Sequence, residues 1–143
     1  MEPANEPPAT LDPALRARLE QAAEGLVYGS EGDHPFTVFA LPWGDAGPVT
    51  PEAFAERAGA APGEPVGETS LDRFLAGHLE AADPADPEAQ RLRPRYERLK
   101  AVLTDSLADV RVFRIGEVEV RCYAVGRDGR GNLAGYRTVA VET

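Results

Sequence analysis

The chain has 143 residues, 43% of them hydrophobic, a length that suits a single domain with its own core. One cysteine, Cys122, excludes an internal disulfide framework and a four-cysteine zinc site, and no apolar run is long enough to span a membrane. The net charge of −9 argues against direct binding to nucleic acid, because the chain would repel phosphates. With no basic and apolar leader at its start, the sequence predicts a cytoplasmic protein.

The first third of the chain predicts an arm, a helix and a strand. Residues 1–11 are rich in proline and poor in apolar side chains, so we expect a flexible arm followed by a single domain over residues 12–143. Asp12-Pro13 begins a helix whose apolar residues recur every three to four positions. A polar turn at 30–35 precedes the β-branched and aromatic run at 36–41, which predicts a strand.

The middle of the chain predicts three helices. Thr50-Pro51 begins a short helix that ends near residue 58, and the segment 59–69, rich in glycine and proline, predicts a loop. A second short helix is capped by Thr69 or Ser70. Asp86-Pro87 begins a long third helix, but Pro94 lies inside its pattern, so either the helix starts later or it is kinked.

In the last third of the chain, apolar and polar residues alternate with the two-residue period of β-strands. Residues 110–115 and 118–124 predict two strands, the second with one buried face, and a glycine-rich hairpin loop at 126–132 leads to a third strand over 133–141. The order favours an α+β fold in which helices pack on a mainly antiparallel sheet that ends in a β-meander. Cys122 falls at an inward position, so we interpret it as an inert core thiol.

Charge is divided unevenly along the chain. Residues 1–89 carry 17 acidic and 4 basic side chains, a net of −13, whereas residues 90–143 carry 7 acidic and 11 basic ones, a net of +4. One interpretation is a solvated acidic surface. The other is an acidic face that binds a basic partner, such as an enzyme that acts on nucleic acid.

The sequence contains no convincing catalytic constellation. The glycines of residues 126–131 lie between two strands, so they indicate a turn and not a phosphate-binding loop. Asp33 next to His34 is either an acid–base pair or an ordinary surface pair. Trp43 and Phe54 are expected at the edge of the core.

Three blocks of sequence carry a family resemblance. The first block comprises Ala23-Glu24-Gly25-Leu26, Ser30-Glu31, His34-Pro35-Phe36 and Val38-Phe39. The second begins at Asp72-Arg73-Phe74-Leu75 and continues through the helix that ends at Leu107. The third comprises residues 112–120, Tyr123, Val125-Gly126, residues 131–135 and Val141-Glu142-Thr143. Over residues 14–143 the chain resembles the nuclease A inhibitor family, whose members inhibit sugar-non-specific ββα-metal nucleases.

The resemblance implies an αβα sandwich and a role as a plug. It implies that Thr143 reaches the metal centre of the nuclease, that Glu31 meets basic residues there, and that Asp83 lies at the interface. Pro84 stands where the family pattern has an aromatic residue. We expect the carboxylates of Glu31, Asp83 and Glu142, and the terminal carboxylate, to replace phosphate oxygens.

The plug interpretation predicts a protein that is not an enzyme and has no cofactor. The metal belongs to the partner nuclease, which a monomer is expected to bind one to one. Two alternatives stay open. One is an acidic interaction domain of the same fold with a non-nuclease partner, and the other is a small hydrolase that uses Asp33 and His34.

Overall fold

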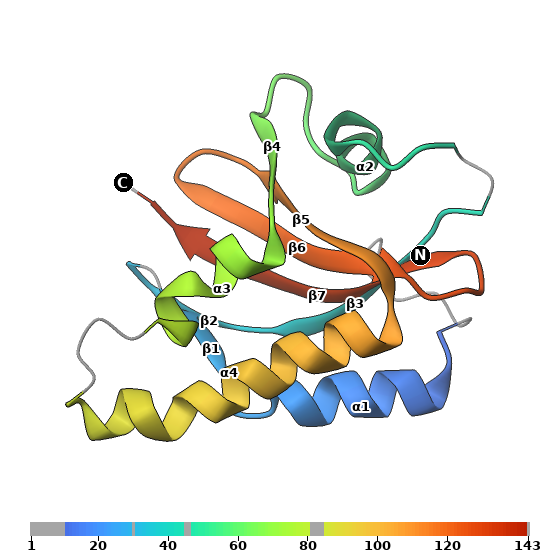
Figure 1. The fold of residues 1–143 in the computed structure, drawn as a ribbon. Coiled ribbons are helices and arrows are strands. Elements are labelled where there is room, and N and C mark those ends of the chain that lie inside the picture. Colours follow the sequence, from blue (N-terminus) through green and yellow to red (C-terminus); the bar gives the residue numbers. More distant parts are fainter. Residues whose placement is uncertain (1–10, 30, 45–46, 81–84, 143) are drawn as a thin grey trace, which may run out of the picture.

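The computed structural model describes residues 11–29, 31–44, 47–80 and 85–142. A five-stranded antiparallel sheet, in the order β3-β7-β6-β5-β4, forms the middle layer (Figure 1). Helices α1, α3 and α4 cover one face of the sheet, and the short helix α2 covers part of the other. The predicted α+β class and the closing β-meander are therefore confirmed.

The structure contains eleven elements within the described residues. The helices are α1 (Pro13–Ala23), α2 (Pro51–Arg57), α3 (Leu71–Leu79) and α4 (Pro87–Ser106). The strands are β1 (Val27–Gly29), β2 (Asp33–Pro35), β3 (Thr37–Pro42), β4 (Val66–Thr69), β5 (Ala108–Ile115), β6 (Glu119–Arg127) and β7 (Asn132–Val141).

The helix starts follow the capping residues in the sequence. The carboxylate of Asp12 accepts a hydrogen bond from the amide of Leu15 at 3.0 Å, and Ser70, not Thr69, caps α3. Helix α4 begins at Pro87 and continues through Pro94, so the alternative of a later start is wrong. Leu11, in the expected arm, is 5% exposed and belongs to the core; residues 1–10 lie outside the described part of the chain.

Three short strands, β1, β2 and β4, were not predicted from the sequence. Strand β2 lies inside the predicted polar turn and pairs with β1 in a separate two-stranded sheet, and β4 lies inside the predicted loop 59–69. Strands of three or four residues are too short to display alternation, and Gly67 weakens the signal of β4 further. The loop of the last hairpin is also shorter than predicted, since β6 continues to Arg127 and β7 starts at Asn132.

Strand β6 is buried on both faces, not on one as predicted. Val120, Cys122 and Ala124 face the three-helix layer, while Tyr123 and Val125 pack under α2. The partner strand β7 lies so close that a Cβ added to Gly135 would come within 1.9 Å of the Ala124 carbonyl oxygen. Glycine at 135 thus permits the central pair of strands to pack closely.

No helix in the described ranges is both long and apolar enough to cross a membrane.

Candidate functional site

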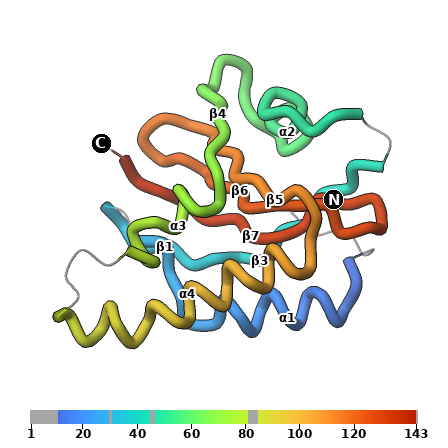
Figure 2. Tube along the Cα trace, in the orientation of Figure 1, coloured from blue at the N-terminus to red at the C-terminus, as the bar shows by residue number. Residues whose placement is uncertain are grey.

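The β1–β2 hairpin brings Glu31 to the end of β7. The hairpin pairs Tyr28 with His34 and Gly29 with Asp33, so Glu31 and Gly32 lie at its tip. From this tip the amide of Glu31 donates a hydrogen bond to the carbonyl oxygen of Val141 at 3.3 Å. Figure 2 shows the hairpin and the end of β7 at the same end of the molecule. Glu31 and Glu142, 111 positions apart in the sequence, therefore lie on one surface.

Two helices hold the base of this hairpin in place. The ring of Tyr28 stacks on Phe74 of α3, with centroids 4.5 Å apart and planes 7° apart. The amide of Gly29 donates to Nε2 of His78 at 3.2 Å, and the hydroxyl of Tyr96 in α4 donates to the carbonyl oxygen of Val27. The position of Glu31 thus depends on contacts with helices that are remote from it in sequence.

Glu142 is fixed by both its backbone and its side chain. Its amide donates to the carbonyl oxygen of Val118, in the turn between β5 and β6, at 2.8 Å. One nitrogen of the Arg114 guanidinium lies 2.6 and 2.7 Å from the two carboxylate oxygens. This contact raises the pKa of Arg114 above its ordinary value, against an opposing effect of burial. A carboxylate has about four lone-pair sites, so Glu142 can still accept further bonds.

Exposed carboxylates gather around Val141. Glu119 is its partner in the β6–β7 register, and Glu117 lies in the turn next to Val118. We call this surface, formed by Glu31, Glu117, Glu119 and Glu142, the acidic end. Val118 is 55% exposed and is the one large exposed hydrophobic residue in the described ranges. The sequence pattern placed Val118 on the buried face of a strand over 118–124; that prediction is wrong, because β6 begins at Glu119 and Val118 lies in the turn before it.

Two of the predicted contact residues cannot be placed. Asp83, with Pro84 beside it, and Thr143 lie outside the described residues. The nearest described neighbour of Thr143 is Glu142, whose position is fixed by Arg114 and Val118.

The acid–base interpretation of Asp33 and His34 finds no support in the local geometry. Consecutive strand residues point to opposite faces, and here Asp33 lies beside Gly29 and His78 while His34 lies beside Gly32. Among the described residues, no group of three or more His, Cys, Asp or Glu side chains is arranged to hold a metal ion.

Cys122 is fully buried, as the sequence predicts. Burial raises the pKa of its thiol to about 11, so the thiol is protonated at neutral pH and is a poor nucleophile.

The match to a protein family includes the acidic end. A family model described as nuclease A inhibitor-like protein matches residues 13–143, from the first residue of α1 onward. The chain belongs to the nuclease A inhibitor-like family. A comparison with curated proteins found no match. Membership indicates an inhibitory role and, in general terms, a nuclease as the protein partner. All four residues that form the acidic end lie within the matched residues.

Proposed function

We propose that the chain inhibits a sugar-non-specific ββα-metal nuclease by occupying its active site with the acidic end. The observation that carries this proposal is the hydrogen bond from Glu31 to Val141, because it joins the hairpin tip and the end of β7 into one projection. Family membership supports the nuclease as target in general terms. The metal-dependent, sugar-non-specific class of nuclease comes from the resemblance of the sequence blocks.

Phosphate mimicry explains why carboxylates suit this role. A nuclease that cleaves without regard to sugar or base must bind the phosphate backbone, which requires a cationic groove and a metal ion. Carboxylates can replace phosphate oxygens as partners of arginine and of the ion. In this proposal Glu31 meets basic residues of the groove, and Glu142 places Thr143 near the metal. Asp83 makes a further contact.

The inhibitor itself then needs neither a cofactor nor a catalytic group. It acts by excluding substrate, so rigidity of the inserted surface matters more than reactivity. The two backbone hydrogen bonds at Glu31 and Glu142 support such rigidity. Val118 supplies an apolar contact among the carboxylates, which fits the usual anatomy of an interface, apolar at its centre and polar at its rim.

The test is a titration of a purified ββα-metal nuclease with the full chain. Cleavage of both DNA and RNA should fall to zero at a one-to-one ratio in saturating Mg²⁺. Unchanged cleavage of both substrates would reject the proposed target and favour an interaction domain with a non-nuclease partner. Inhibition that disappears when Mg²⁺ is raised would instead indicate removal of the ion by the acidic surface.

A further inference from the structure

Strand β3 ends the sheet with one edge unpaired. It pairs with β7 through Thr37–Arg137 to Pro42–Asn132, and no other strand in the described residues adjoins it. The run Phe36–Trp43 contains no charged side chain. Proteins usually protect such edges with charges, bulges or covering segments, because unpaired amides and carbonyls attract another strand. The edge of β3 has no charged residue of its own, so any protection must come from what lies beside it.

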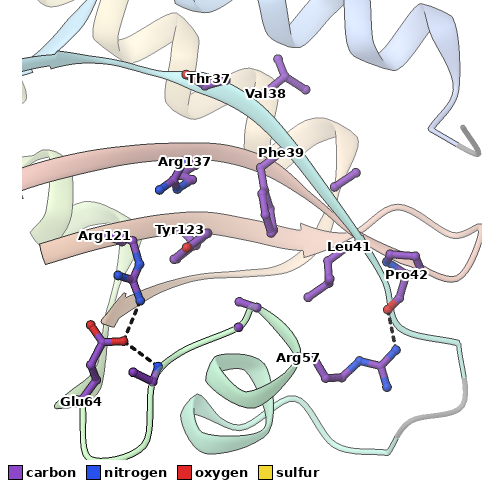
Figure 3. A pocket seen from close by; sticks show the side chains of 14 residues that line it. Thr37, Val38, Phe39, Leu41, Pro42, Arg57, Glu64, Arg121, Tyr123 and Arg137 are labelled. Carbon is purple, nitrogen blue, oxygen red and sulfur yellow. Dashed lines mark hydrogen bonds and ion pairs between the residues drawn. The ribbon is translucent and has the colours of Figure 1, made fainter. Parts of the chain in front are cut away.

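A pocket of about 670 Å³ opens beside this edge, on the face of the sheet that α2 covers only in part. All six residues of β3 contribute to its lining (Figure 3). Its charged residues are three arginines and one glutamate: Arg57, Arg121, Arg137 and Glu64. A local excess of positive charge is unusual in a chain whose net charge is −9.

The three arginines of the pocket differ in the hydrogen-bond partners that the chain provides for them. Arg121 pairs with Glu64 at 2.9 Å, and Arg57 donates to the carbonyl oxygen of Pro42 at 2.8 Å. The Nε of Arg137 is buried and has no hydrogen-bond partner in the described part of the chain. Its guanidinium lies over the ring of Tyr123, 5.9 Å from the centroid. A buried donor without a partner is costly, so Arg137 is the group that an incoming acceptor would satisfy.

We propose that the edge of β3 binds an extended acidic segment of a protein partner as an added strand. Backbone hydrogen bonds along β3 would supply the pairing, and side chains of the added strand would alternate between the two faces. Those on the α2 side enter the arginine pocket, which selects carboxylates. Those on the opposite side face a second hollow, which is lined by Phe36 and Val38 of the strand and its approach and by Arg16, Glu20 and Glu24 of the α1 side.

Charge decides between this occupant and a second copy of the chain. Antiparallel pairing of β3 with its own copy about a two-fold axis normal to the sheet would bring two arginine pockets together on one face. An acidic strand instead neutralises the pocket. The overall negative charge of the chain opposes an acidic ligand only weakly at about 0.15 M salt, where the Debye length is about 8 Å. The site shares no residue with the acidic end and does not rest on the proposed function.

The first test measures binding of a labelled ten-residue peptide in which three glutamates alternate with valine or threonine. The matched peptide carries glutamine in place of glutamate. Fluorescence anisotropy should show at least about tenfold weaker binding for the glutamine peptide and for the Arg137→Gln protein. Arg98→Gln, which removes the same charge from an exposed position on α4, should bind like the unaltered protein. Arg57→Gln provides a second pocket variant should Arg137→Gln fail to fold.

The second test asks where the peptide lies. Amide hydrogen exchange of the protein with bound peptide should slow within residues 37–42 and remain unchanged in β4, the opposite edge of the sheet. Equal affinity for both peptides, protection outside β3, no measurable binding, or dimerisation through β3 in sedimentation would each overturn the proposal. None of these readouts depends on nuclease inhibition.

Discussion

Arg114 binds both carboxylate oxygens of Glu142, at 2.6 and 2.7 Å, across the intervening strand β6. The pair fixes the residue that precedes Thr143 from the side, while the Val118 carbonyl fixes it through the backbone. An arginine outside the acidic end therefore controls how part of that surface is presented.

Replacing Arg114 with glutamine should weaken inhibition more than it weakens the fold. Both side chains are partly exposed, so loss of the ion pair should lower the free energy of unfolding by no more than about 1 kcal/mol. If Arg114 acts through Glu142, a double variant that carries Arg114→Gln and Glu142→Gln should inhibit as well as whichever single variant is the poorer inhibitor. Inhibition constants and denaturant unfolding measure the two effects. Additive losses in inhibition would show that Arg114 acts independently of Glu142.

Glu31→Lys should reduce inhibition by at least about 30-fold, because reversing a charge that is buried against arginine costs about 2–5 kcal/mol. Glu56→Lys is the matched control, since Glu56 is exposed on α2, a helix that takes no part in the acidic end. Inhibition constants for the two variants should differ clearly, whereas their thermal stabilities should not. Equal constants would remove Glu31 from the interface.

Thr143→Ser should preserve inhibition and Thr143→Val should not. The hydroxyl is proposed to reach the ligand shell of the nuclease metal, and valine keeps the shape of threonine without that oxygen. Both variants should melt within about 2 °C of the unaltered protein, because substitutions away from the core typically cost under about 0.5 kcal/mol. An added C-terminal tag should also abolish inhibition. A tagged protein that still inhibits at a one-to-one ratio would contradict the plug mechanism.

Association with the nuclease should slow as ionic strength rises. The net charge of −13 over residues 1–89 would attract a cationic groove through solvent, and salt screens that attraction. Stopped-flow association over a tenfold range of salt should show the change mainly in the association rate and little in dissociation. A rate that does not vary with salt would mean that the acidic surface serves solubility alone.

Stability should fall on mild acidification through His78. Burial lowers the pKa of His78 below its ordinary 6.5, partly offset by the charge of Asp33, and its Nε2 accepts the Gly29 amide only when unprotonated. The unfolded chain takes up this proton first as pH falls, so the contribution is complete above about pH 6.5 and is lost from there down to the lowered pKa. His78→Gln, whose amide oxygen can accept the same bond, should show a shallower pH dependence in denaturant unfolding.

The control for His78 is the other histidine of the chain. His34→Gln is the matched control, because it removes the other imidazole of this region and leaves the bond between Gly29 and His78 in place. Identical slopes for His78→Gln and the unaltered protein would show that carboxylates alone cause the acid sensitivity.

Long elements could be predicted from the sequence because each has its own hydrophobic periodicity and its own capping or turn residues. Helices α1, α2 and α4 start at an acidic or hydroxyl cap followed by proline, and β5 to β7 are long enough to alternate. Strand β4 could not be predicted, because four residues that include Gly67 have no pattern of their own. It becomes a strand through its pairing with β5.

The candidate site could be proposed from the sequence as separate residues but not as a surface. Glu31 and Glu142 were selected by resemblance, yet their proximity depends on the β1–β2 hairpin and on its contact with the end of β7. Pairings between distant segments leave no local signal in a single sequence. For the same reason Arg114 and His78, which hold these residues in place, were not anticipated.

The position of β7 between β3 and β6 also has a consequence for biosynthesis. Strand β3 ends at Pro42, and its only strand partner in the described chain begins at Asn132, about 90 residues later. Translation proceeds at about 5–20 residues per second, so β3 has no strand partner for about 5–20 s after its own synthesis. During translation the nascent chain therefore exposes an uncharged strand to chaperones and to neighbouring chains. The sheet forms only after the meander has emerged, so under the proposed function inhibition of a nuclease made at the same time begins late.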